Sequence, residues 1–162
     1  MFLSNFLIKN TLSSEKSFIW DSNLKKLKIV KSLKSVNINL LTGIERQKET
    51  LIRNTLNFAR GNFTNNALLW GSRGNGKSSL IKSIFLEINK NYNNLKLIQI
   101  NKNDIFDIEI IYEKFSKIDN YRFIVFIDDL SFEKIDSDYK IIKSTLDGSI
   151  QNQPNNILLY VT

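Results

Sequence analysis

The chain has 162 residues, of which 42% are hydrophobic and 11% aromatic, and a net charge of +7. This composition suits one folded domain with an apolar core and argues against disorder. Cysteine and histidine are both absent, which excludes disulfides, thiol chemistry and imidazole catalysis and argues against a zinc site. The sequence shows neither an apolar run long enough for a membrane span nor a signal-peptide pattern, so we expect a cytoplasmic protein without a membrane partner.

The first 41 residues form an apolar segment that we expect to be mostly helical and to pack on the domain formed by residues 42–162. This segment also carries a cluster of lysines: Lys25, Lys26, Lys28, Lys31 and Lys34. Such a cluster suits a nucleic-acid surface. The lysines alternate with apolar residues, however, and lysine is abundant throughout the chain, which favours a solvated face.

The stretch TGIERQKETLIRNTLNFARG predicts a helix. Thr42 is placed to cap its first turn, and Glu45, three residues later, would complete a capping box. Gly61 is placed to end it. Apolar and small residues recur at helical spacing between these limits, which predicts one buried face.

Strands and helices alternate through the rest of the chain. Apolar runs predict strands at 67–71, 95–100, 122–127 and 156–162, with Trp70 buried at the end of the first. Helical periodicity predicts helices at 77–88, 104–118 and 137–150, the last ended by Gly148. Strands that are apolar on both faces are typical of a parallel sheet covered by helices on each side. We therefore predict an α/β fold, a three-layer αβα sandwich with a mainly parallel sheet.

A glycine-rich loop, LLWGSRGNGKSSL, follows the first of these strands. Gly71, Gly76, Lys77 and Ser78 match the pattern G-x-x-x-x-G-K-[ST]. Glycines let backbone amides converge on an anion, and the N-terminus of the next helix adds partial positive charge. Lys77 would reach the β- and γ-phosphates of a nucleotide, and the hydroxyl of Ser78 would be a ligand of Mg²⁺. The nucleotide-binding residues that we predict here are Gly71, Ser72, Arg73, Gly74, Asn75, Gly76, Lys77, Ser78 and Ser79.

Two acids follow the apolar run FIVFI. Asp128 stands at the carboxyl end of a strand that we expect to lie next to the strand of the glycine loop, where it would hold Mg²⁺ through water. Asp129 would take a proton from the water that attacks the γ-phosphate, or would orient it. Glu133 is an alternative base, and a role at the surface is an equal interpretation of that residue.

The order of these segments resembles the AAA+ division of P-loop ATPases, over about residues 40–162. The segments GIERQK, LLWGSRGNGKSSL, DDLSFE, YKIIKSTLDGS and PNNILLYVT are similar to those of a bacterial AAA+-type family of ATP-binding proteins whose function is unknown. The resemblance implies binding of ATP with Mg²⁺, an adenine pocket near Gly43 and Ile44, and assembly into a homo-oligomeric ring. It also implies action on a protein or a nucleic acid.

AAA+ proteins place a polar sensor residue just beyond the fourth strand, followed by a fifth strand, arginines that act across a subunit interface, and a helical lid. We expect these parts beyond Thr162, in a longer protein of which this chain is a fragment. Such arginines contribute about 10³–10⁵ in rate, so we expect the chain alone to bind ATP but to hydrolyse it very slowly.

The sequence leaves two other functions open. A nucleotide-gated adaptor or loader that acts on DNA would use the same site and the lysine cluster. A small-molecule kinase would need a mobile lid rich in arginine, and the sequence between Asp128 and Thr162 has no arginine.

Overall fold

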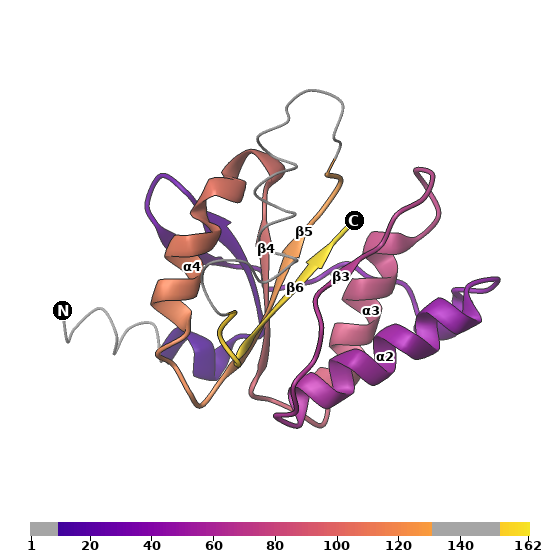
Figure 1. The fold of residues 1–162 in the computed structure, drawn as a ribbon, viewed down its shortest axis with the longest axis horizontal. Helices are drawn as coiled ribbons and strands as arrows, with labels where there is room; N and C mark the ends of the chain where they lie inside the picture. Colours follow the sequence, from indigo (N-terminus) through magenta and orange to yellow (C-terminus); the bar gives the residue numbers. More distant parts are fainter. Residues whose placement is uncertain (1–9, 131–152) are drawn as a thin grey trace.

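The computed structural model describes residues 10–130 and 153–162 and shows an α/β fold (Figure 1). In these residues one mostly parallel, six-stranded sheet has the order β2-β1-β4-β5-β6-β3. The strands are β1 (Ser17–Asp21), β2 (Lys26–Ile29), β3 (Ala67–Leu68), β4 (Leu95–Ile100), β5 (Arg122–Ile127) and β6 (Ile157–Val161). The helices are α2 (Glu45–Ala59), α3 (Lys77–Asn89) and α4 (Ile108–Phe115), with 3₁₀ segments η1 (Ile38–Leu40) and η2 (Lys102–Asp107).

The sheet is covered on both faces, as the apolar strands predict. Alternate residues of β5 enter two separate cores: Val125 packs with α4 and β1, whereas Phe126 packs with α2 and α3. Figure 1 shows α4 on one side of the sheet and α2 with α3 on the other. The predicted layers and the mainly parallel sheet are therefore confirmed.

The N-terminal segment differs from its prediction. Residues 10–14 are helical, but β1 and β2 form an antiparallel hairpin, and β1 also pairs with β4 in parallel. The expectation of a mostly helical segment is therefore wrong for the described part of it. The stretch from Ser17 to Asp21 is rich in aromatic and branched residues that suit a strand buried on both faces, and Phe18 and Trp20 are each 1% exposed.

The sequence predicts that the strand before Asp128 lies next to the strand of the glycine loop, and this prediction is also wrong. β6 lies between β3 and β5, and it pairs with each of them in parallel. Periodicity locates strands along the chain but carries no information about their order in a sheet. The consequence is that Thr162, directly after β6, lies beside Asp128.

Two predicted boundaries move. Helix α2 begins at Glu45, and the residue before it, Ile44, makes no capping hydrogen bond with its side chain. Thr42 is thus not the cap, although Oε1 of Glu45 does accept the N–H of Gly43 at 2.9 Å. The first site strand is only Ala67–Leu68, and Trp70 is 88% exposed rather than buried. The chain leaves the sheet at this point, and β3 is an edge strand of the described sheet, so no neighbouring strand covers Trp70.

The region predicted as one helix at 104–118 divides into η2 and α4, with a non-helical residue, Asp104, inside the first. The predicted helix at 137–150, with Gly148 and Glu133, lies outside the described residues. Within residues 10–130 and 153–162, no helix has both the length and the apolar character needed to cross a membrane.

Candidate functional site

A cleft of about 800 Å³ opens where β3, β5 and β6 end. Its walls are the glycine loop with the start of α3 on one side and the residues after β5 and β6 on the other. The lining residues are Leu68, Leu69, Trp70, Gly71, Arg73, Gly74, Asn75, Gly76, Lys77, Ser78, Ser79, Asp128, Asp129, Leu130 and Thr162. The cleft therefore lies at the carboxyl edge of a parallel sheet, the usual place for ligands in open α/β folds.

The glycine loop has a backbone shape that depends on glycine. Gly74 and Gly76 have φ angles of 82° and 75°, in the left-handed region that residues with a side chain rarely adopt. Gly76 is also the residue before α3, so its turn aims the first amides of that helix at the cleft. A Cβ atom on Gly76 would lie 3.4 Å from Leu41, so the segment before α2 packs against the loop here.

Lys77 is the first residue of α3, and its side chain folds back over the loop. Its Nζ donates to the carbonyl oxygens of Gly71 and Ser72, each at 2.8 Å. Among the described residues, the ammonium group is therefore held by neutral acceptors of the loop. Anionic oxygens are stronger acceptors for an ammonium than carbonyl oxygens are.

Three oxygen-bearing side chains meet next to the loop. Oδ1 of Asp128 accepts a short hydrogen bond from the hydroxyl of Ser78 and a second, of 2.9 Å, from the hydroxyl of Thr162. These residues come from α3, the end of β5 and the end of β6. The sheet order makes the meeting possible, because β6 pairs with β5 and so brings Thr162 beside Asp128.

Asp128 also has a cationic neighbour. Nζ of Lys82, one turn along α3 from Ser78, lies 3.6 Å from Oδ2 of Asp128 and 5.6 Å from the ring centroid of Phe126. Both charged side chains are largely buried, at 20% and 25% exposure. Lys82 therefore balances the carboxylate charge from the side facing the core.

Asp129 is held in an unusual conformation. Its φ of 56° is left-handed, and its N–H donates to Oγ1 of Thr162 at 3.2 Å. Its carboxylate forms an ion pair of 3.2 Å with Arg73 of the glycine loop. The pair spans the cleft from the loop to the end of β5.

Most of the predicted site residues come together in this cleft. Ser72 does not line it, although its carbonyl receives Lys77. Gly43 and Ile44 do not line it either, and Leu41 is the residue of that segment that approaches the loop.

Sequence reasoning missed Thr162 and Lys82. The sequence predicts a polar residue beyond Thr162, after the fourth predicted strand, 156–162. In the structure this strand is β6, which ends at Val161, so Thr162 itself is the polar residue that follows it. A polar residue after a fully apolar run was the available signal. Lys82 lies four residues after Ser78, which places both on one face of a helix.

The lysine cluster near the N-terminus is partly neutralised within the chain. Lys28 forms an ion pair of 2.8 Å with Asp21, and Lys25 forms one of 2.6 Å with Asp107. Hydrogen bonding from Lys28 lowers the pKa of Asp21 below its ordinary value. These contacts tie the hairpin to itself and to η2, so they give the nucleic-acid interpretation no support.

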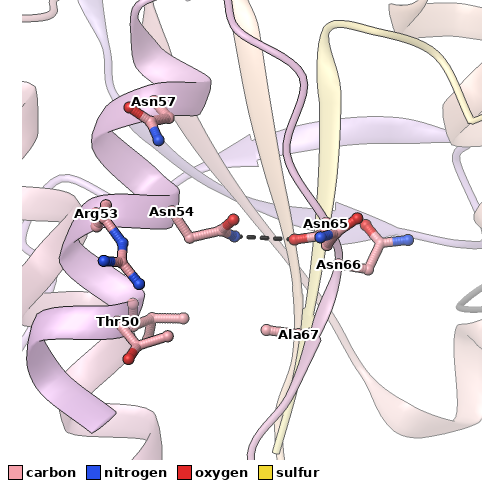
Figure 2. Close-up of a pocket in the computed structure, with 8 residues that line it drawn as sticks. Thr50, Arg53, Asn54, Asn57, Asn65, Asn66 and Ala67 are labelled. Carbon is pink, nitrogen blue, oxygen red and sulfur yellow. Dashed lines mark hydrogen bonds between the residues drawn. The ribbon is translucent and has the colours of Figure 1, made fainter. Parts of the chain in front are cut away.

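A second pocket, of about 320 Å³, lies between α2 and the segment that enters β3 (Figure 2). Several of its lining residues are asparagines. Nδ2 of Asn54 donates to the carbonyl of Asn65 at 2.9 Å and to the hydroxyl of Tyr160 at 3.1 Å. Oδ1 of Asn66 accepts the N–H of Leu159 at 2.8 Å. These amides join α2 to the edge of the sheet, which is a structural role.

Comparison with protein families gives one assignment. The model of the family described as "Protein of unknown function (DUF815)" matches residues 13–162, and the chain belongs to this family. None of the curated proteins compared with the chain matches it.

Proposed function

We propose that this member of the DUF815 family binds ATP with Mg²⁺ in the cleft and hydrolyses it, as an ATPase of the AAA+ type. One observation carries the proposal: Ser78, at the start of the helix that follows the glycine loop, hydrogen-bonds the carboxylate of Asp128 across the cleft. A phosphate cradle and an acidic metal site need this juxtaposition, and an ordinary glycine-rich turn does not.

The loop and α3 supply what a phosphate chain requires. Backbone amides that converge on a concave surface, together with a helix N-terminus, form an anion site without any side-chain charge. Lys77 adds an ammonium group that can exchange two carbonyl acceptors for phosphate oxygens. The cleft is also large enough for a nucleotide, because small-molecule sites typically measure about 300–1,000 Å³.

The residues present fit Mg²⁺. This ion prefers oxygen ligands and is usually held by one or two protein groups, with phosphate and water completing its shell. Ser78 and Asp128 would hold it, and no cluster of three or more acidic residues that could hold a metal by itself occurs in the described residues. When bound, Mg²⁺ would neutralise charge on the β- and γ-phosphates.

We assign to Asp129 the role of activating the attacking water. Its carboxylate would accept a proton from the attacking water as the new oxygen–phosphorus bond forms. The bond from the γ-phosphorus to the bridging oxygen then breaks, and ADP and phosphate leave. We further propose that a ring of identical subunits completes the site with arginines in trans, which is why we expect slow hydrolysis from the chain alone.

Titration with a fluorescent ATP analogue in the presence of Mg²⁺ tests the proposal. We expect saturable binding that weakens strongly in Lys77→Ala and on removal of Mg²⁺ with a chelator. Lys90→Ala is the matched control, because Lys90 lies at the other end of α3 and pairs only with Glu87 among the described residues. Absence of binding, or equal binding by Lys77→Ala, would overturn the proposal.

A further inference from the structure

The ion pair between Arg73 and Asp129 joins the glycine loop to the proposed base. We propose that Arg73 is a positioning residue that holds Asp129 while the third phosphate site is empty, and that transfers to the terminal phosphate when ATP binds. This inference rests on the proposed function and adds a means by which the same site distinguishes ATP from ADP.

The position and exposure of the ion pair would allow a phosphate group to replace Asp129 as the partner of Arg73. Both side chains line the cleft, and they are 82% and 60% exposed, so water screens their attraction. Exposed pairs of this kind contribute little to stability. A phosphate group offers a guanidinium more charge and more acceptor oxygens than one carboxylate does, and arginine binds it in a bidentate manner. A terminal phosphate in the cleft would therefore compete successfully for Arg73.

Transfer of Arg73 to the terminal phosphate would free the side chain of Asp129 without moving the backbone of Asp129. The N–H of Asp129 donates to Oγ1 of Thr162, and the N–H of Leu130 donates to the carbonyl oxygen of Thr162. The carboxylate would then be available to water at the end of the phosphate chain. ADP has no third phosphate, so it would leave the pair with Arg73 in place.

Arg73 and Lys77 differ in the part of a bound nucleotide that each would contact. Lys77 is held by loop carbonyl oxygens and sits within the cradle, where it would meet the phosphate chain of either nucleotide. Arg73 reaches across the cleft to the residue that follows Asp128. Only a group that extends as far as the acidic side of the cleft would draw it away. This difference predicts that Arg73 sets the preference for a triphosphate.

Calorimetric titration with MgADP and with a non-hydrolysable MgATP analogue tests the inference. For Arg73→Ala we expect about a tenfold or greater loss of affinity for the triphosphate and little change for MgADP. Arg73→Lys should recover part of the loss. Arg53→Ala is the control, since Arg53 is exposed on α2 and lines the second pocket rather than the cleft.

A double-mutant cycle separates exchange from simple charge repulsion. Asp129→Asn should raise the triphosphate affinity by up to about fivefold, because it removes the competitor for Arg73. The gain should disappear in Arg73→Ala/Asp129→Asn. An equal gain in both backgrounds, or unchanged triphosphate affinity in Arg73→Ala, would overturn the inference while leaving nucleotide binding intact. If the unaltered chain binds neither nucleotide, both proposals fall.

Discussion

The hydroxyl of Thr162, directly after β6, donates a hydrogen bond of 2.9 Å to Oδ1 of Asp128, directly after β5. The same hydroxyl oxygen accepts the N–H of Asp129 at 3.2 Å. One side chain thus fixes the rotamer of the first acid and the backbone of the second. Because β6 lies between β3 and β5, this role falls to the residue directly after β6.

Thr162→Val should therefore weaken binding of the ATP analogue in the presence of Mg²⁺. The variant keeps the shape of the side chain but removes both hydrogen bonds, each worth about 1 kcal/mol. We expect a loss of roughly fivefold to tenfold when Mg²⁺ is present and a smaller loss when a chelator removes it. Thr162→Ser, which keeps the hydroxyl, is the control and should bind like the unaltered chain. An equal loss in both conditions would contradict a role in orienting Asp128.

Trp70 should report occupancy of the cleft. It is 88% exposed and lines the cleft beside Gly71, whereas Trp20, the other tryptophan, is 1% exposed. Acrylamide quenching of tryptophan fluorescence should therefore come mainly from Trp70, and it should decrease when MgATP fills the cleft.

Trp70→Phe provides the control for this measurement. Quenching in this variant should be weak and should not respond to nucleotide. A nucleotide-dependent decrease that persists without Trp70 would place the change at Trp20 and would contradict occupancy of this cleft.

The sequence predicts the central strands and α3 well because apolar runs mark the buried strands and apolar residues at helical spacing mark the buried face of α3. The stretch 95–100 is mainly apolar, interrupted by Lys96 and Gln99, and forms β4 with the predicted bounds. The spacing of Gly71, Gly76, Lys77 and Ser78 likewise predicts a sharp turn before a helix, since few other structures need two glycines with positive φ.

What the sequence could not give is the relation between segments. The positions of Thr162 and Lys82 beside Asp128 depend on strand order and helix rotation, which local patterns do not encode. The hairpin at β1 and β2 was missed because short apolar runs suit strands and helices equally. Trp70 was misplaced because hydrophobicity alone does not show where a strand leaves its sheet.

Asp107 should link stability to acid pH. Burial raises the pKa of Asp107, but hydrogen bonds from Lys25 and Trp20 outweigh burial and bring that pKa below its ordinary value of 3.8. A lowered pKa stabilises the fold above pH 3.8, and this contribution is lost as pH falls through the lower, folded-state value. The expected effect of Asp107→Asn at pH 7 is a loss of about 1–3 kcal/mol in the free energy of unfolding.

Urea unfolding at several pH values measures this difference. The difference in the free energy of unfolding between Asp107→Asn and the unaltered chain should become smaller as pH falls below 3.8. Asp119→Asn, at an exposed position, is the control and should show little difference at any pH. A gap that stays constant into acid would contradict a charged role for Asp107.

Two buried tyrosines should respond in opposite ways to loss of the hydroxyl. The Tyr160 hydroxyl bonds Thr55 at 2.8 Å and Asn54 at 3.1 Å, whereas the Tyr112 hydroxyl is buried with no hydrogen-bond partner among the described residues. Tyr160→Phe should cost about 1 kcal/mol, because it leaves polar partners unsatisfied. Tyr112→Phe should be neutral or stabilising, since it removes a buried polar group that lacks a partner.

The same pair makes a prediction at alkaline pH. Burial raises the pKa of Tyr160 to about 12, although hydrogen bonds from Thr55 and Asn54 oppose it. The neutral hydroxyl is thus favoured in the folded state, so its contribution is complete below pH 10 and falls as pH rises towards about 12. Tyr160→Phe should reduce this fall in the free energy of unfolding, measured by urea unfolding from pH 9 to pH 11.

Burial also raises the pKa of Tyr112. Tyr112→Phe should therefore reduce the fall in the free energy of unfolding at alkaline pH without a loss at neutral pH. An equal loss at neutral pH in both variants would contradict the difference in hydrogen bonding, because packing alone would then account for the two rings.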